Sequence, residues 1–340
     1  MKVLLLAGSS HADATYSAVL CGLADSLSAA GHHSLVSGRP AHDRRLALKA
    51  PKGSLDITRD LPRLLRQADV VHLHFSGVFH PWMKALTRSR TKIVLTFQDY
   101  AHPELPPNAP VQRQALSQLA AKAEAVTAVS KSLAKALAKG LPALVGRVKV
   151  VPNGWRPLPL VKTPRAPRPY ILSVGRLAPY KGTDITLMAF SLLARKDIDL
   201  VLCGAPFHRA HIAGLIKGLG LRGRVRLTGL RPAAQARALT QGCLFHVSAA
   251  RAEAFGMANI EAMACGKAVV APRVGGIVDY IKNGVNGILI APKDPDALAA
   301  AMDRLLEDPA LRVRLGRRAR SDAQAFTWKS VAARYALHYR

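Results

Sequence analysis

The chain alternates short apolar runs with longer segments of helical pattern along its whole length. The runs show no polar alternation, which is typical of strands buried on both faces of a parallel sheet. Strands and helices that take turns in this way build βαβ units, so the sequence predicts an α/β protein with parallel sheets. The runs predicted as strands are KVLLLA, HSLVSG, DVVHLHF, KIVLTF, AVTAVS and VKVV, followed by YILSVG, DLVLCG, RVRLTG, CLFHVS, AVVAP and GILI.

A proline-rich segment separates the two series of runs. In RPLPLVKTPRAPRP, residues 156–169, five of fourteen residues are proline, which excludes a helix or a central strand. We therefore expect one doubly wound, Rossmann-like domain at residues 1–155, a linker at 156–169 and a second Rossmann-like domain at 170–320. Ligands of such domains lie at the carboxyl ends of the strands, so the functional residues should follow the strands.

The net charge of +28 is spread over both halves of the chain. This excess favours polyanionic partners, among them acidic membranes, phosphorylated glycans, nucleotide phosphates and nucleic acid. Aromatic residues make up only 5% and are not interleaved with basic ones, which argues against a nucleic-acid platform. No Gly-x-Gly-x-x-Gly follows the first strand and no Gly-x-x-x-x-Gly-Lys-Ser/Thr occurs, which excludes dinucleotide oxidoreductases and P-loop proteins.

Cysteine usage and hydropathy favour a cytoplasmic protein. The cysteines lie in apolar segments without Cys-x-x-Cys spacing, which argues against a zinc site or a disulfide framework. The apolar run of MKVLLLAGSSHADA is shorter than the roughly 7–15 residues of a signal-peptide core, and we interpret it as the first strand. No run reaches the roughly 18 apolar residues of a membrane span, so any membrane contact should be peripheral.

Basic side chains follow strand YILSVG in the second half. Arg176 ends this strand, and Lys181 stands with Gly182 at the start of a helix. Free N–H groups at a helix N-terminus favour anions, so these two cations suit a diphosphate. Two solvated surface cations would give the same spacing, and the spacing alone leaves both interpretations open.

Two carboxylates surround an apolar segment in AARAEAFGMANIEAMACG. Glu253 is predicted on a loop between strand and helix, and Glu261 inside the helix that follows. Gly256 allows a ligand close to the backbone, and both carboxylates can accept hydrogen bonds from hydroxyl groups. A helix-terminal charge and an unrelated exposed glutamate remain the alternative interpretation.

These motifs resemble a known family. VGRL with the following KG, the E-x7-E segment with its internal FG, and EAMACGKAVVAPRVGGIVDYIKNGVNGILI closely resemble the C-terminal domain of the retaining glycosyltransferases of family 4, which have the GT-B fold. AVTAVSKSL and VVPNG resemble the inter-domain region, and FTWKSVAARY resembles the crossover helix. The resemblance covers most of residues 120–340. It implies two Rossmann-like domains that face a cleft, with a helix at 321–340 that crosses back to the N-terminal domain.

The resemblance also implies roles. A nucleotide-diphosphate sugar would bind the C-terminal domain and a glycan or lipid-linked acceptor the N-terminal domain, with no cofactor and no metal ion, because cations and N–H groups can stabilise the leaving diphosphate. Arg176 and Lys181 would hold the diphosphate, and Glu261 would accept from the ribose hydroxyls. The groups implied at the transferred sugar are Glu253 and the backbone of Phe255, Gly256 and Met257.

The first half offers fewer candidates. Period two places His72 and His74 on one face of strand DVVHLHF, and His74 lies nearer its carboxyl end. His74 is the catalytic candidate, as a contact to the donor sugar or acceptor, and a structural histidine is the alternative. Gln98 stands where the family often has a histidine, before Asp99. The GSSHAD turn replaces the family's common glycine pair, and the acceptor-side candidates are Ser9, His11 and Asp99. The resemblance implies front-face attack and identifies no general base.

Lys131, Lys135 and Lys139 recur every four residues, with leucines at the same spacing. Such a helix can lie on an acidic membrane, or it can be an ordinary packed helix with a solvated face. We expect a metal-independent, retaining, hexosyl-type glycosyltransferase of cell-envelope assembly (lipopolysaccharide, glycolipid or exopolysaccharide), cytoplasmic or peripheral on the inner face of the membrane. The alternatives are a sugar-nucleotide epimerase of the same fold and a non-catalytic, transferase-like polyanion-binding protein.

Overall fold

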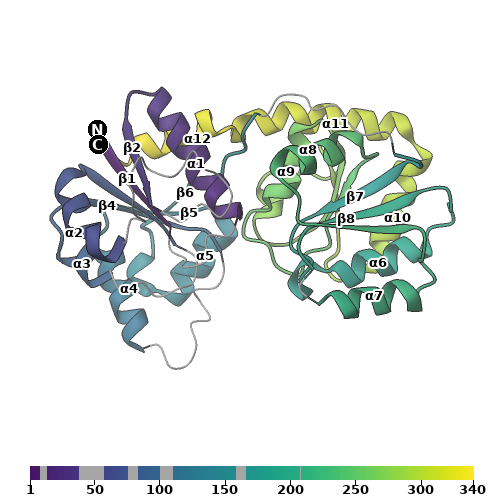
Figure 1. The fold of residues 1–340 in the computed structure, drawn as a ribbon, viewed down its shortest axis with the longest axis horizontal. Helices are drawn as coiled ribbons and strands as arrows, with labels where there is room; N and C mark the ends of the chain where they lie inside the picture. The colour runs from purple at the N-terminus through teal and green to yellow at the C-terminus, as the bar shows by residue number, and fades with distance from the viewer. Residues whose placement is uncertain (8–13, 38–56, 76–82, 100–109, 158–165, 207) are drawn as a thin grey trace. The chain divides into compact units, whose positions relative to one another are not determined.

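The computed structural model describes residues 1–7, 14–37, 57–75, 83–99, 110–157, 166–206 and 208–340. The chain divides into two compact units (Figure 1). The N-terminal unit comprises residues 1–156 and 326–340, and the C-terminal unit comprises residues 157–325. The predicted acceptor-side residues Ser9 and His11 lie outside the described residues.

The N-terminal unit contains a six-stranded parallel sheet with the order β2-β1-β3-β4-β5-β6. The order reverses between β1 and β3, which makes this pair the topological switch point. Helices α1 and α12 cover one face of the sheet and α3, α4 and α5 the other (Figure 1). The elements are β1 (Lys2–Ala7), α1 (Ala14–Ala29), β2 (His33–Ser37), α2 (Ile57–Gln67), β3 (Val70–Phe75), α3 (Met83–Arg88), β4 (Lys92–Phe97), α4 (Pro110–Lys122), β5 (Ala125–Ala128), α5 (Lys131–Gly140), η1 (Pro142–Leu144), β6 (Val148–Val150) and α12 (Trp328–Ala336).

The C-terminal unit contains a second six-stranded parallel sheet, with the order β12-β11-β10-β7-β8-β9. Here the order reverses between β7 and β10. Helices α6, α7 and α10 cover one face and α8, α9 and α11 the other (Figure 1). The elements are β7 (Tyr170–Val174), η2 (Pro179–Lys181), α6 (Thr183–Leu192), β8 (Asp199–Cys203), α7 (Arg209–Gly218), β9 (Val225–Gly229), α8 (Ala233–Gly242), β10 (His246–Val247), α9 (Met257–Ala264), β11 (Val269–Pro272), η3 (Gly275–Asp279), β12 (Ile288–Ile290), α10 (Pro295–Glu307), α11 (Pro309–Ala323) and η4 (Gln324–Phe326).

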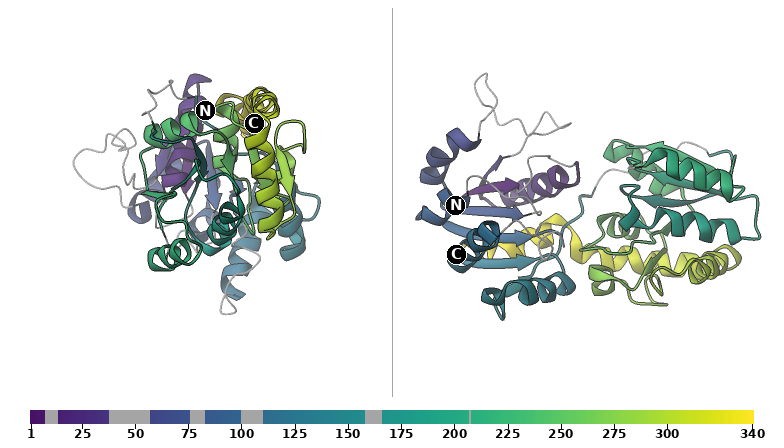
Figure 2. Two further views of the ribbon diagram at one scale, coloured as in Figure 1. Left: turned by 90° about the vertical axis from the view of Figure 1, so that its right-hand side faces the viewer. Right: turned by 90° about the horizontal axis from the view of Figure 1, so that it is seen from below.

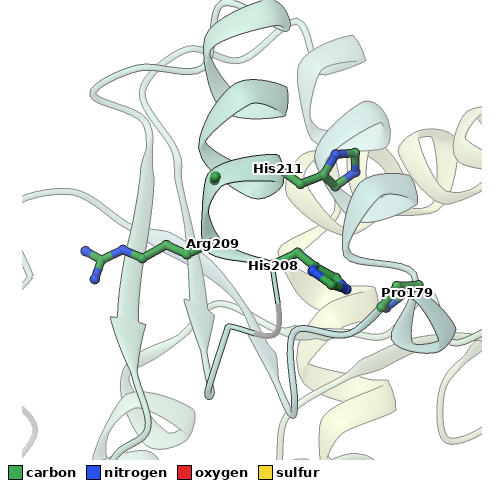
Figure 3. A pocket seen from close by; sticks show the side chains of 5 residues that line it. Pro179, His208, Arg209 and His211 are labelled. Atoms are coloured by element: carbon green, nitrogen blue, oxygen red, sulfur yellow. The ribbon is translucent and has the colours of Figure 1, made fainter.

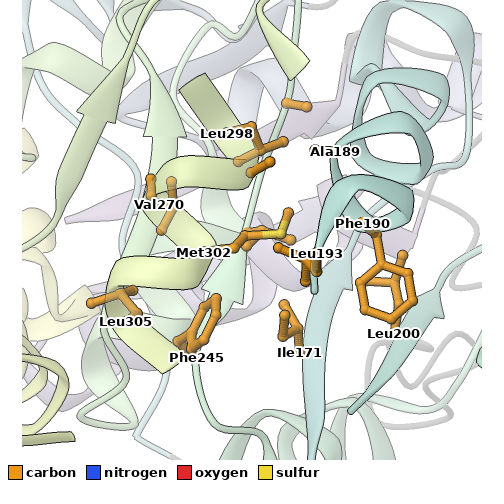
Figure 4. Packing of buried hydrophobic residues seen from close by; sticks show 14 of the residues in the cluster. Ile171, Ala189, Phe190, Leu193, Leu200, Phe245, Val270, Leu298, Met302 and Leu305 are labelled. Atoms are coloured by element: carbon orange, nitrogen blue, oxygen red, sulfur yellow. The ribbon is translucent and has the colours of Figure 1, made fainter. Parts of the chain in front are cut away.

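The predicted α/β fold with two parallel, doubly wound sheets is confirmed, and each apolar run predicted as a strand contains one. The strands form where the sequence lacks polar alternation because both sheet faces are covered by helices. All residues of β8 and β11 are buried, as are five of the six residues of β4. In the C-terminal unit, side chains of α6 and α10 interlock over the sheet, with Phe190, Phe245 and Met302 fully buried among aliphatic neighbours (Figure 4).

The last residues of the chain pack into the N-terminal unit. Helix α12 lies against α1, and Figure 2 shows the yellow C-terminal segment beside the purple helix. The Trp328 ring occupies the space beside two glycines: a Cβ atom at Gly22 would lie 2.1 Å from the ring, and one at Gly154 would lie 2.5 Å from it. The backbone N–H of Trp155 donates to the Phe326 carbonyl at 2.8 Å, so the two chain segments that leave this unit lie side by side. Within the described ranges, no helix is both long and apolar enough to cross a bilayer.

Candidate functional site

The switch point of the C-terminal sheet brings two loops together. Strands β7 and β10 are neighbours, and the chain continues from them in opposite directions. The loop after β7 carries Arg176 and Lys181, and the loop after β10 carries Glu253. Lys181 Nζ donates to Glu253 Oε2 at 2.5 Å, and the two side chains are 27% and 14% exposed. Residues that the sequence assigned to separate motifs therefore form one ion pair at the edge where ligands of this architecture bind.

The turn that carries Arg176 depends on a close backbone approach. A Cβ atom at Gly204, which follows β8, would lie 1.8 Å from the Gly175 carbonyl oxygen. Gly204 also has φ 157°, at the limit of the range that favours glycine. The Leu177 N–H donates to the Ala205 carbonyl at 2.9 Å, which continues the contact past the strand ends. The Arg176 side chain is consequently presented from a fixed turn and is exposed to solvent.

The N-terminus of α9 has no side-chain cap. Its N-cap, Gly256, has φ 93°, and a Cβ atom there would lie 2.7 Å from the Tyr280 hydroxyl oxygen. That hydroxyl donates to the Phe255 carbonyl at 2.8 Å, and the two rings pack with centroids 5.4 Å apart. Phe255 is 3% exposed, so its ring belongs to the packing of this turn. With Met257 as the first helical residue, the uncapped N–H groups of this turn can bind an oxygen atom of a ligand.

Glu261 lies one turn farther along α9. Its side chain is exposed. Desolvation raises the pKa of its carboxyl to about 7, and the charge of Arg237 opposes this rise. Desolvation disfavours the charged form of a carboxylic acid, so a partner that donates hydrogen bonds to the carboxylate would shift this pKa back down.

An open pocket of about 590 Å³ lies where α7 begins (Figure 3). It reaches the η2 turn, the one that carries Lys181, through Pro179. Its lining residues are Pro179, His208, Arg209, Ala210 and His211. This pocket was not predicted from the sequence, although the motif HRAH follows strand β8, a position where ligands of such sheets bind.

In the N-terminal unit, a buried chain of hydrogen bonds ends at His74. Asn153 Nδ2 donates to Gln98 Oε1 at 2.7 Å, and Gln98 Nε2 donates to His74 Nδ1 at 3.0 Å. Because Nδ1 accepts, the neutral His74 ring carries its proton on Nε2. That Nε2–H is buried and has no partner among the described residues. Full burial lowers the pKa of His74 to about 3, so the ring is neutral at physiological pH.

The neighbouring His72 is held on both sides. Its Nδ1 lies 2.7 Å from the Tyr339 hydroxyl and its Nε2 lies 2.7 Å from Thr96 Oγ1. Thr96 in turn bonds Thr127 at 2.6 Å. His72 therefore joins the C-terminal segment to the sheet. Asp99 lies two residues after β4 and is half-buried.

The apolar face of helix α5 is buried inside the N-terminal unit. Leu133 and Leu137 are 0% and 1% exposed, while the side chains of Lys131, Lys135 and Lys139 face solvent. The leucines are therefore not available to a bilayer, and only the lysine face is. The described residues contain no group of three or more histidine, cysteine, aspartate or glutamate side chains that could hold a metal ion.

Two family profiles match the chain. The profile described as Glycosyltransferase Family 4 matches residues 17–157, and the profile described as Glycosyl transferases group 1 matches residues 161–322. A curated relative, the D-inositol 3-phosphate glycosyltransferase of Corynebacterium diphtheriae, is 34% identical over 167 residues, which are 47% of this chain and 39% of the relative. The chain thus matches less than half the length of such curated relatives.

Solved structures agree along the whole chain. Anabaena HepE, determined in complex with UDP, has a TM-score of 0.74 at 21% identity and covers 99% of each chain. The lipopolysaccharide outer core galactosyltransferase WaaB, in its apo form, has a TM-score of 0.68 at 16% identity, with 99% of each chain covered. At these identities the likeness shows a common fold. The solved structures and the two switch-point sheets show the GT-B fold, and the two profiles place the chain in glycosyltransferase family 4.

Proposed function

We propose that the protein is a retaining glycosyltransferase that moves a hexose-type sugar from a nucleotide-diphosphate sugar to a glycan or lipid-linked acceptor. The observation that carries the proposal is the Lys181–Glu253 pair at the switch point, beside the uncapped N-terminus of α9. A cation for phosphate, a carboxylate for sugar hydroxyls and free N–H donors thus lie at one sheet edge. This set matches the parts of a nucleotide sugar.

In the proposed complex, Arg176 and Lys181 bind the diphosphate. Lys181 leaves Glu253 for a phosphate oxygen, and the released Glu253 carboxylate accepts from a hydroxyl of the transferred sugar. The N–H groups from Gly256 to Met257 bind a further oxygen, and Glu261 accepts from the ribose. The cations and the N–H groups stabilise the negative charge that develops on the leaving diphosphate.

The transfer step breaks one bond and forms one. The acceptor hydroxyl oxygen attacks the anomeric carbon on the face that the diphosphate leaves, the bond from that carbon to the phosphate oxygen breaks, and the hydroxyl proton passes to that oxygen. The anomeric configuration is retained, and neither a metal ion nor a protein nucleophile is required. In the N-terminal unit, we assign the His74 Nε2–H as the donor to a sugar or acceptor oxygen: it lacks a hydrogen-bond partner among the described residues, although it is buried in the ligand-free protein.

We further propose that the acceptor is anionic or lies at an acidic membrane of the cell envelope, as in lipopolysaccharide or glycolipid assembly. The net charge of +28 and the lysine face of α5 support electrostatic attraction to such a surface. Because Leu133 and Leu137 are packed inside the unit, contact would be by charge and would weaken with salt.

The test is a transfer assay. The full chain is incubated with UDP, GDP, ADP and CMP sugars and with envelope lipid extracts, and the anomeric configuration of any product is determined by NMR. We expect one donor to be consumed only when an acceptor is present, and the product to keep the donor's anomeric configuration. Epimerisation of a nucleotide sugar without acceptor would favour the epimerase instead, and an inverted product would contradict retention.

A further inference from the structure

Arg251 reaches from the loop that carries Glu253 to the turn that carries Lys181. Its guanidinium donates through Nη1 to Asp184 Oδ1 at 2.9 Å and through Nη2 to Asp184 Oδ2 at 2.6 Å. Nη1 also donates to the Pro179 carbonyl at 2.6 Å, and the Arg251 backbone N–H donates to the Tyr180 carbonyl at 2.8 Å. One residue therefore binds the turn η2, the first turn of α6 and its own loop together.

The same two loops are also in direct backbone contact. Gly182, directly after Lys181, has φ 66°, and a Cβ atom there would lie 2.0 Å from the Ala249 carbonyl oxygen. On the far side, the Gly276 N–H donates to the Glu253 carbonyl at 2.9 Å. The Glu253 loop is consequently held from both sides, and the Lys181 turn cannot shift along it without breaking the Arg251 contacts.

The Arg251–Asp184 pair is half-exposed, with side chains 32% and 29% accessible. Ion pairs at this exposure contribute little to the free energy of unfolding. A planar guanidinium that binds a carboxylate with two parallel bonds does fix direction and distance, which a lysine cannot do. The Arg251 guanidinium also holds the pKa of Asp184 below its usual value, so the carboxylate stays ionised. The pair is therefore suited to fixing local geometry.

We propose that Arg251 and Asp184 are positioning residues that hold the Lys181 turn in register with Glu253, so that one nucleotide-diphosphate sugar can engage both side chains. The inference rests on the proposed function of this site. With the backbone of both loops fixed, Lys181 needs only a rotamer change to move from the Glu253 carboxylate to a phosphate, and little of the binding free energy is lost in ordering the loops.

The test is a double-mutant cycle on donor binding, measured by calorimetry with the nucleotide sugar that the wild type binds. Arg251→Gln is expected to raise Kd about tenfold, or about 1.4 kcal/mol. In the Lys181→Ala background the same change should raise Kd less than about twofold, because Arg251 acts through Lys181. Arg251→Lys should not restore binding, and Asp184→Asn should reproduce the loss.

The chain offers a matched control. Arg195 binds Asp197 with two bonds at 3.0 and 2.5 Å on an exposed segment before β8. Arg195→Gln should leave Kd unchanged. Equal effects of Arg251→Gln in both backgrounds would overturn the positioning role and leave the donor site intact. If the wild type bound no nucleotide sugar at all, the proposed function would fail, and this inference with it.

Discussion

The ammonium group of Lys181 lies 2.5 Å from Oε2 of Glu253, across 72 residues of sequence. The pair joins the loops that follow β7 and β10, and the side chains of Lys181 and Glu253 are 27% and 14% exposed. In the absence of a donor, each group satisfies the other. A nucleotide sugar that takes both groups must exchange this ion pair for two new contacts, and this competition has measurable consequences.

Replacing Glu253 should affect the binding of the diphosphate and the binding of the sugar in different ways. In Glu253→Gln, Lys181 no longer has an anionic partner, so a nucleoside diphosphate should bind as tightly as to the wild type or tighter, by up to roughly 1 kcal/mol. The sugar nucleotide should lose its advantage over the bare diphosphate, because a contact to the sugar is gone. Calorimetric titration with both ligands measures the two effects. Weaker binding of the bare diphosphate would contradict the proposed exchange.

Glu261 should give donor binding a pH dependence. Its pKa in the free protein is raised to about 7, and hydroxyl donors bind the ionised form better. Donor affinity should therefore rise as the pH increases from 6 to 8, by up to about tenfold, with release of a proton. A nucleotide sugar is the suitable ligand, because its diphosphate lacks the ionisation near pH 6 of a terminal phosphate. Glu261→Gln should remove the dependence, and an unchanged pH profile in this variant would refute the assignment.

Acid should destabilise the N-terminal unit through His74. The pKa of His74 is about 3 in the folded protein, against 6.5 in the unfolded chain. Its contribution to stability is complete above pH 6.5 and is lost as the pH falls toward 3, at about 1.4 kcal/mol per pH unit. Urea unfolding at pH 7.5 and 5.5 tests this, followed by tryptophan fluorescence, because the described tryptophans, Trp155 and Trp328, belong to this unit.

The variant His74→Gln should show a smaller loss between the two pH values than the wild type. His33→Gln is the control, because His33 is exposed at the start of β2, and it should keep the wild-type slope. Equal losses of stability between the two pH values in His74→Gln and the wild type would show that the pKa of His74 is not lowered in the folded protein.

Alanine at Gly22 should destabilise the protein, contrary to helix propensity. Gly-to-Ala in a helix interior normally gains about 1 kcal/mol. In α1, however, the new Cβ would lie 2.1 Å from the Trp328 ring. The ring cannot move away from α1 because Gly154 packs against it. We expect Gly22→Ala to lower the free energy of unfolding by about 1–3 kcal/mol. Gly214→Ala in α7, where nothing lies within 4 Å, should be neutral or stabilising in thermal unfolding. A higher free energy of unfolding in Gly22→Ala would show that the Trp328 ring is not packed tightly against Gly22.

The strands were predictable from the sequence because parallel strands covered on both faces must be apolar throughout. This reason holds for β11, which is apolar and buried at every residue. The order of the strands was not predictable, since it depends on which edges pair after the chain has folded. The fold itself was reached through the motifs around Glu253 and Glu261, whose resemblance to family 4 the two matching profiles confirm.

Side-chain partnerships at the site were harder to predict. Lys181 and Glu253, like Asp184 and Arg251, meet only because β7 and β10 are neighbours. The spacing of α5 left two interpretations open, and the burial of Leu133 shows that its apolar face belongs to the core. The burial of His74 depends on neighbours far away in the sequence, such as Asn153. The binding roles of Arg176, Lys181, Glu253 and Glu261 stay predictions.

One measurement tests the donor site most directly: calorimetric titration of the full chain with UDP, GDP, ADP and CMP sugars. We expect sugars of one base to bind, with a single site per chain. Lys181→Ala and Glu261→Ala should each weaken this binding by about 1.5–3 kcal/mol, and Arg176→Ala should do so at least as strongly. Lys217→Ala, at the exposed far end of α7, should not change it. Undiminished affinity in the Lys181, Glu261 and Arg176 variants, or no binding of any nucleotide sugar by the wild type, would show that these residues do not form a donor site.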